Sequence, residues 1–142
     1  AANGRLQYVS LLSFIDQKHR NFGDAWDIVS YGRDIFFRTL TKIFQFNGSS
    51  ITVYPAISEW SFLGKSNNKL YAHDYAKGLH VFNQNTWQPV ETINTLPIAD
   101  PVTAIMDSED GSSVITTLKS GMFRLKANVI TAIPSPNSEL FR

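Results

Sequence analysis

Residues 42–54, KIFQFNGSSITVY, have the pattern of a β-hairpin and constrain the fold more than any other stretch. Residues 43–46 form an apolar, aromatic run, and residues 51–54 form a second run rich in β-branched and aromatic side chains, which strands favour. Between the two runs, Asn47 and Gly48 tolerate the positive φ that a tight turn requires. The pattern predicts two antiparallel strands joined by a short turn.

This hairpin recurs twice downstream, each time preceded by two further runs that suit strands. The first hairpin strand aligns with residues 79–82 and 122–125, and the second with residues 87–90 and 130–133. The two preceding runs are residues 26–29 and 35–38 in the first unit, 60–63 and 70–73 in the second, and 102–105 and 114–117 in the third. Four short strands repeated every ~35–45 residues are typical of a propeller blade.

The repeat predicts a single all-β domain, a partial β-propeller of about three four-stranded antiparallel blades plus one N-terminal strand. The expected segments are residues 1–10 (outer strand of a preceding blade), 26–54, 60–93 and 102–133 (blades), and 134–142 (linker). Propellers typically need about four to eight blades, so three cannot close a ring. We therefore expect two uncovered apolar end faces, which further blades of the same propeller or a second copy of the chain would cover.

Composition excludes several classes of function. With 13 basic and 12 acidic residues, the net charge of +1 gives no electrostatic reason to expect nucleic acid as a partner. No apolar run approaches the ~18 residues of a membrane span, so we expect no direct membrane contact by this segment. There are no cysteines, which excludes disulfides and thiolate metal sites.

Several segments resemble the two-component regulator propeller repeat. Residues 107–117, DSEDGSSVITT, and 120–125, SGMFRL, have its acidic-Gly turn, its short strand ending in Thr, and its following Gly-apolar-aromatic strand. Residues 68–82 follow the same plan, and residues 5–11 and 21–28 resemble the region between early blades of bacterial sensors of this type. The resemblance implies a non-catalytic, ligand-sensing or signal-input segment in the periplasm or another extracytoplasmic space.

No motif for catalysis or for metal or cofactor binding stands out. His19, His73 and His80 have no metal-ligand spacing, and residues 107–111 lack the alternating oxygen ligands and distal glutamate of a calcium loop. There is no Gly-x-Ser-x-Gly elbow and no phosphate-binding glycine loop. We expect no cofactor, no metal and no enzymatic activity in this segment.

Candidate ligand-binding residues gather on the face where, in a propeller, the connections between blades meet the turns between the second and third strands. Trp26 and Trp60 occupy equivalent positions at the entry to the first strand of a blade, where a tryptophan either stacks on a sugar ring or packs between blades. Arg38, His73 and Thr117 are expected at equivalent positions, with Tyr75 close by. The long connection 10–25 adds His19, Arg20 and Asp24.

The expected partner is a carbohydrate or another small ligand. Two alternatives remain open. The first is a protein-interaction scaffold without a small-molecule ligand. The second is a propeller glycan hydrolase or lyase, in which carboxylates would meet across a channel.

Overall fold

The computed structural model describes residues 15–17 and 24–134, and within them the chain forms β-strands and no helix of more than one turn. The strands are β1 (Asp27–Tyr31), β2 (Asp34–Arg38), β3 (Lys42–Phe46), β4 (Ile51–Pro55), β5 (Trp60–Ser66), β6 (Lys69–Asp74), β7 (Gly78–Asn83), β8 (Thr86–Pro89), β9 (Val102–Asp107), β10 (Ser113–Thr117), β11 (Met122–Lys126) and β12 (Val129–Ile133). Among these residues no helix is long and apolar enough to cross a membrane.

The strands form three open four-stranded sheets, β1–β4, β5–β8 and β9–β12, in which each strand pairs antiparallel with the next one along the chain. This confirms the prediction of an all-β chain with three four-stranded antiparallel sheets. The N-terminal strand expected at residues 1–10 lies outside the described residues, as does the expected linker beyond Pro134.

Tight turns join the strands where the sequence predicts them. Between β5 and β6, Asn67 and Asn68 have φ values of 50° and 62°, in the left-handed region that asparagine tolerates better than most side chains. Positive φ at both central residues of a two-residue hairpin matches the right-handed twist of the strands it joins. Ser66 and Lys69 consequently pair directly on either side of this turn.

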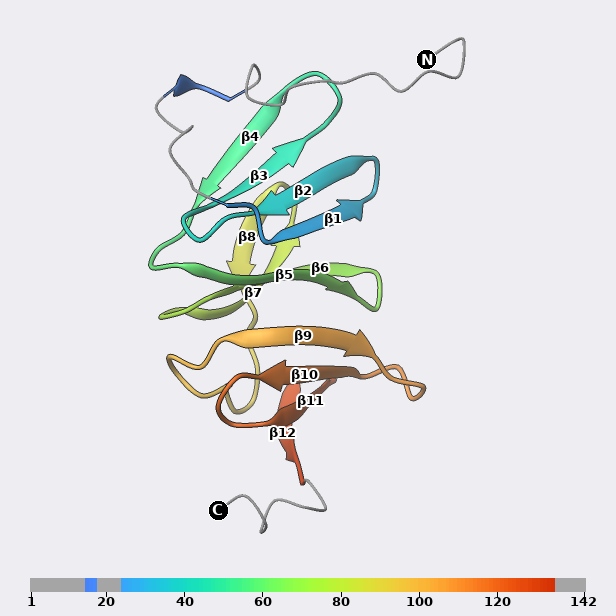
Figure 1. Ribbon diagram of the computed structural model, residues 1–142. Helices are drawn as coiled ribbons and strands as arrows, with labels where there is room; N and C mark the ends of the chain where they lie inside the picture. Colours follow the sequence, from blue (N-terminus) through green and yellow to red (C-terminus); the bar gives the residue numbers. More distant parts are fainter. Residues whose placement is uncertain (1–14, 18–23, 135–142) are drawn as a thin grey trace.

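The three sheets stack face to face in chain order, as Figure 1 shows. The first strand of the middle sheet, β5, packs against β1 on one side and against β9 on the other. The stacking buries one apolar layer between the first and second sheets and another between the second and third.

Aromatic side chains dominate the layer between the first and second sheets. The ring of Phe36 on β2 meets that of Phe82 on β7 edge to face at 5.0 Å, and Trp87 on β8 packs beside both. Trp60 packs in the same layer against Trp87 and donates its indole N–H to the carbonyl of Tyr54, 3.0 Å away. Edge-to-face contacts between rings of the two sheets stabilise their packing more than the burial of apolar surface alone would.

The connection from β8 to β9, residues 90–101, helps to build the layer between the second and third sheets. Ile93 pairs in parallel with Val129 on β12, its N–H donating to the carbonyl of Asn128 at 2.8 Å. Leu96 then enters the buried layer with Val102 and Ile105. The connection therefore runs along the outer edge of the third sheet and closes one side of the space between the two sheets.

The two end faces of the stack both expose apolar side chains, but they differ in how far they are covered. On the first sheet, Phe37 and Phe44 stack at 5.0 Å and are buried together with Ile15, whereas Ile28 and Ile35 on the same face are 74% and 43% exposed. On the third sheet, Met106 and Met122 share the outward face and are 50% and 40% exposed. Among the described residues, both end faces therefore leave large apolar side chains open to solvent, and the face of the first sheet is covered in part.

Candidate functional site

A cavity of about 300 Å³ lies between the second and third sheets, beside the β6–β7 turn and the β8–β9 connection. This is the face of the molecule on which the sequence predicted a binding site. Most of the lining is apolar, and the residues that line it are His73, Tyr75, Ala76, Lys77, Gly78, Leu79, Pro89, Val90, Thr92, Thr95, Leu96, Pro97, Ile98 and Ile130. Two of the predicted residues, His73 and Tyr75, are among them.

A β-bulge at Ser61 sets the geometry around His73. Trp60 pairs with Asp74 while Phe62 pairs with His73, so Ser61 is the extra residue on β5. Because Asp74 and His73 are consecutive on β6, the bulge directs Trp60 toward the first sheet and Phe62 toward the third. The hydroxyl of Ser61 reaches Nδ1 of His73 and also the backbone carbonyl of His73, at 3.2 Å.

His73 is only 1% exposed, and burial lowers its pKa to about 4. The neighbouring His80 acts in the same direction, while the carboxylates of Asp74 and Asp100 act against it. The imidazole is therefore neutral at pH 7, and this wall of the cavity carries a hydrogen-bonding group without a charge.

Two buried carboxylates, those of Asp74 and Asp100, form hydrogen bonds with the backbone of the loops beside the cavity. Asp74, at the end of β6, accepts hydrogen bonds from the N–H groups of Ile57 and Ser58, each at 2.9 Å. Burial alone would raise the pKa of Asp74, but hydrogen bonds from the hydroxyl and N–H of Ser58 and from the N–H groups of Lys77 and Ala76 lower it below its usual value. In the second sheet the aspartate lies at the end of β6 and binds the connection before β5. In the third sheet the aspartate lies in the connection instead: Asp100, before β9, accepts a hydrogen bond from the N–H of Lys119 in the β10–β11 turn at 2.8 Å.

Arg38 and Trp60 lie apart from the cavity, between the first and second sheets. Arg38 pairs with Asp27 at 2.6 Å and donates to the carbonyl of Trp60 at 2.8 Å. Trp60 is 4% exposed and stands edge to face with His80 at 5.8 Å. Of the two roles considered for Trp60, packing between sheets is the one that the structure supports.

The remaining predicted residues are dispersed. Trp26 precedes β1 and is 61% exposed, and Asp24 is exposed as well. His19 and Arg20 lie outside the described residues. The structure thus brings His73 and Tyr75 together, but it does not gather Trp26, Arg38, Trp60 or Asp24 around them.

The expected equivalence of Thr117 with Arg38 and His73 is wrong by one residue. The side-chain partners across the first two strands are Asp27 with Arg38, Ser61 with His73, and Thr103 with Thr116, the last pair at 2.6 Å. Thr117 instead matches Thr39, since each caps its turn by donating to a carbonyl three or four residues ahead. The bulge between Val102 and Ala104 on β9 shifts the register at this point.

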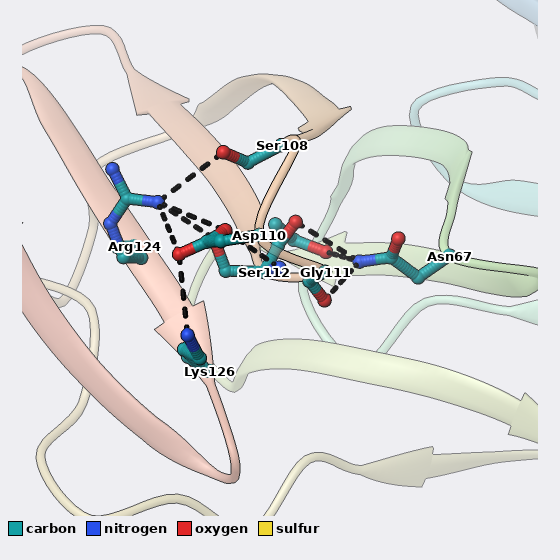
Figure 2. Close-up of polar contacts among 8 residues, drawn as sticks. Asn67, Ser108, Asp110, Gly111, Ser112, Arg124 and Lys126 are labelled. Carbon is teal, nitrogen blue, oxygen red and sulfur yellow. Dashed lines mark hydrogen bonds and ion pairs between the residues drawn. The ribbon is translucent and has the colours of Figure 1, made fainter.

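On the opposite face, the turns between the first and second strands are tied to one another. Figure 2 shows Asn67 of the β5–β6 turn donating to the carbonyls of Gly111 and Ser112, each at 3.1 Å. Asp110 accepts from Ser112, Arg124 and Lys126, and the hydrogen bond from Ser112 is the main cause that lowers its pKa. These hydrogen bonds pair Asp110 with side chains of the same sheet.

In the described part of the chain no group of three or more acidic or histidine side chains is arranged to hold a metal ion.

Sequence reasoning missed Ser61 and the wall supplied by the β8–β9 connection. Ser61 is a single polar residue between Trp60 and Phe62, which is also the pattern of a regular alternating strand, so the sequence contains no signal of the bulge. The connection 90–101 contains Thr92, Thr95 and Leu96, a mixture of polar and apolar residues that indicates a segment with one side buried.

In comparisons with known proteins, no family model, no curated protein and no solved structure matches this chain.

Proposed function

We propose that this chain is a run of three consecutive blades of a β-propeller that serves as a ligand-sensing, signal-input segment of a bacterial two-component-type regulator. The fold supports the first part of the proposal. Each sheet is a four-stranded meander, and β1, β5 and β9 are neighbours across the stack, as the inner strands of adjacent blades are. The resemblance of residues 68–82 and 107–125 to the two-component regulator repeat suggests the regulator and an extracytoplasmic location.

The open face of the third sheet also supports an incomplete propeller. The corresponding faces of the first and second sheets, around Phe36 and Tyr71, are each covered by the next sheet. The equivalent position on the third sheet is Val114, flanked by the exposed Met106. Further blades, or a second copy of the chain, would cover this face in the same way.

The cavity at His73 is the observation that carries the sensing role. It lies between two blades on the face where their connections meet, and a buried neutral imidazole forms part of its wall. Pockets that are mostly apolar with a few placed polar groups are the usual form of a small-molecule site. In this role the chain binds a ligand without transforming it.

Screening the 142-residue chain against a small-molecule library by two-dimensional NMR tests this function. We expect bound compounds to shift the resonances of His73, Leu79 and Leu96. Ala76→Trp, which fills the cavity mouth, should abolish these shifts, whereas Ala25→Trp, at an exposed position before β1, should leave them unchanged. A library without a single binder, or binding that survives Ala76→Trp, would contradict a sensing role for this cavity.

A further inference from the structure

The size and lining of the His73 cavity restrict what it can hold. Apolar cavities on the order of 150 Å³ are large enough for benzene. At about 300 Å³, this cavity has room for a single ring with a short substituent but not for an oligosaccharide. Leu79, Leu96 and Ile130 present apolar surface to such a ring.

The hydrogen bonds of Ser61 determine which nitrogen of His73 carries the proton. The hydroxyl of Ser61 has one proton, and the backbone carbonyl of His73 can only accept. Both contacts of the Ser61 oxygen are hydrogen bonds only if Ser61 donates to the carbonyl and Nδ1–H donates to Ser61. In this tautomer Nε2 has a lone pair and acts as an acceptor.

Within the described part of the chain, the side-chain hydrogen bond of His73 is made by Nδ1, and none is made by Nε2. Among the other polar groups of the lining, the hydroxyl of Thr92 already donates to the carbonyl of Asn94 at 2.6 Å. Lys77 is exposed to solvent at the cavity mouth rather than buried in its wall. Tyr75 is half-buried and Thr95 is exposed, so among the side-chain acceptors of the lining Nε2 belongs to the most deeply buried residue.

The geometry points to a small, uncharged ring compound with one hydroxyl group, a phenol in the simplest case, which donates its proton to Nε2 of His73. This inference rests on the proposed ligand-binding function and names its ligand class. A carboxylate is disfavoured, because it would place an acceptor against an acceptor and a charge against apolar walls. A ring without a donor would leave Nε2 unpaired at the buried end of the cavity.

Three matched compounds test the inference on the full 142-residue chain: 4-ethylphenol, its methyl ether 4-ethylanisole, and 4-ethylbenzoate. Dissociation constants and the ring resonances of His73 are followed together by NMR titration at pH 7. We expect 4-ethylphenol to bind and to shift the His73 ring signals. The dissociation constants of the ether and the carboxylate should each be higher by a factor of about ten or more, as expected for the loss of one hydrogen bond.

Two substitutions separate the role of Nε2 from that of the fold. His73→Asn keeps a donor near Ser61, but its shorter side chain leaves no acceptor at the position of Nε2, so the phenol should lose its advantage over the ether. His73→Gln places an amide oxygen near the position of Nε2 and should keep part of that advantage. Thermal melts of both variants check that they remain folded.

Equal affinities for the phenol and the ether, or tighter binding of the carboxylate, would overturn the ligand class. So would the absence of binding by all three compounds. The proposed function fails separately, through the library screen with Ala76→Trp. If a library compound of another class binds the wild-type chain and Ala76→Trp abolishes its binding, the sensing role stands and only the phenol-type ligand is refuted.

Discussion

Arg38 and Asp27 form an ion pair across β1 and β2, with Nε of Arg38 2.6 Å from Oδ2 of Asp27. The pair also joins two sheets, because Arg38 donates to the carbonyl of Trp60 and Asp27 accepts from the N–H of Leu63. In the second sheet, Ser61 and His73 form the equivalent side-chain pair across β5 and β6. A side-chain pair that holds the first two sheets together thus corresponds to the pair that sets the tautomer at the cavity.

We predict that Arg38→Met destabilises the chain by about 3 kcal/mol, near the lower end of the range for breaking a buried pair, since Asp27 is partly exposed. Methionine keeps the packing of the aliphatic stem but leaves the Asp27 carboxylate and the Trp60 carbonyl short of a donor. Urea unfolding measures the loss. Lys126→Met, which removes a solvent-exposed partner of Asp110, is the control and should cause no measurable change. Equal effects of the two substitutions would show that the Arg38 pair contributes no more than a surface contact.

A second prediction contrasts two tryptophans that the sequence places at equivalent positions. Trp60→Ala should cost about 3–5 kcal/mol, because it removes a ring buried between two sheets and its hydrogen bond to Tyr54. Trp26→Ala should change stability by less than about 0.5 kcal/mol, since this side chain is 61% exposed. Chemical denaturation followed by circular dichroism compares the two. A large loss in Trp26→Ala would mean that this side chain packs against a part of the chain outside the described residues.

Local patterns in the sequence were sufficient to predict the strands and their faces. The strict alternation along residues 79–82 predicts that His80 faces away from Leu79 and Val81. In the structure Leu79 packs toward the third sheet, while His80 stands against Trp60 toward the first. The turn at Asn67 and Asn68 was predictable for the same reason, since its chemistry lies within four residues.

The cavity was not predictable, because it depends on features that no local pattern records. The bulge at Ser61 reverses the face of Trp60, which simple alternation would place beside Phe62. The wall formed by Leu96 depends on Ile93 pairing with Val129, a contact between residues far apart in the sequence. Both features are set by how sheets pack, and single-strand propensities do not contain that information.

A third prediction concerns pH. The folded-state pKa of His73, about 4, lies below the value of 6.5 for a free histidine. The unfolded chain therefore binds the proton first as pH falls, so this residue's contribution to stability is complete above pH 6.5 and is lost between pH 6.5 and 4. The loss should be on the order of 3 kcal/mol. His73→Asn cannot titrate and should lose correspondingly less stability over this interval.

Stability measured by urea unfolding at several pH values from 7 to 4 checks this difference, and histidine NMR reads the pKa directly. All other ionisable residues are the same in the two proteins, so the difference between the two pH profiles reports on His73. Parallel pH profiles for the two proteins, or a His73 ring that titrates near pH 6.5, would rule out a buried neutral imidazole.

The last prediction follows from the uncovered face of the third sheet. Met106 and Met122 stand on this face beside Val114, and the same face of each preceding sheet is buried against its neighbour. Because apolar faces of this kind drive association, we expect the isolated chain to self-associate as its concentration rises. Replacing both residues with glutamate should reduce the association, since like charges would then meet across the contact. Ile57→Glu, at an exposed position outside this face, should leave the association unchanged and serves as the control. Sedimentation equilibrium at several loading concentrations measures the effect. A chain that remains monomeric at high concentration would argue against a fourth sheet packing there, because the face would then be stable in water without a partner.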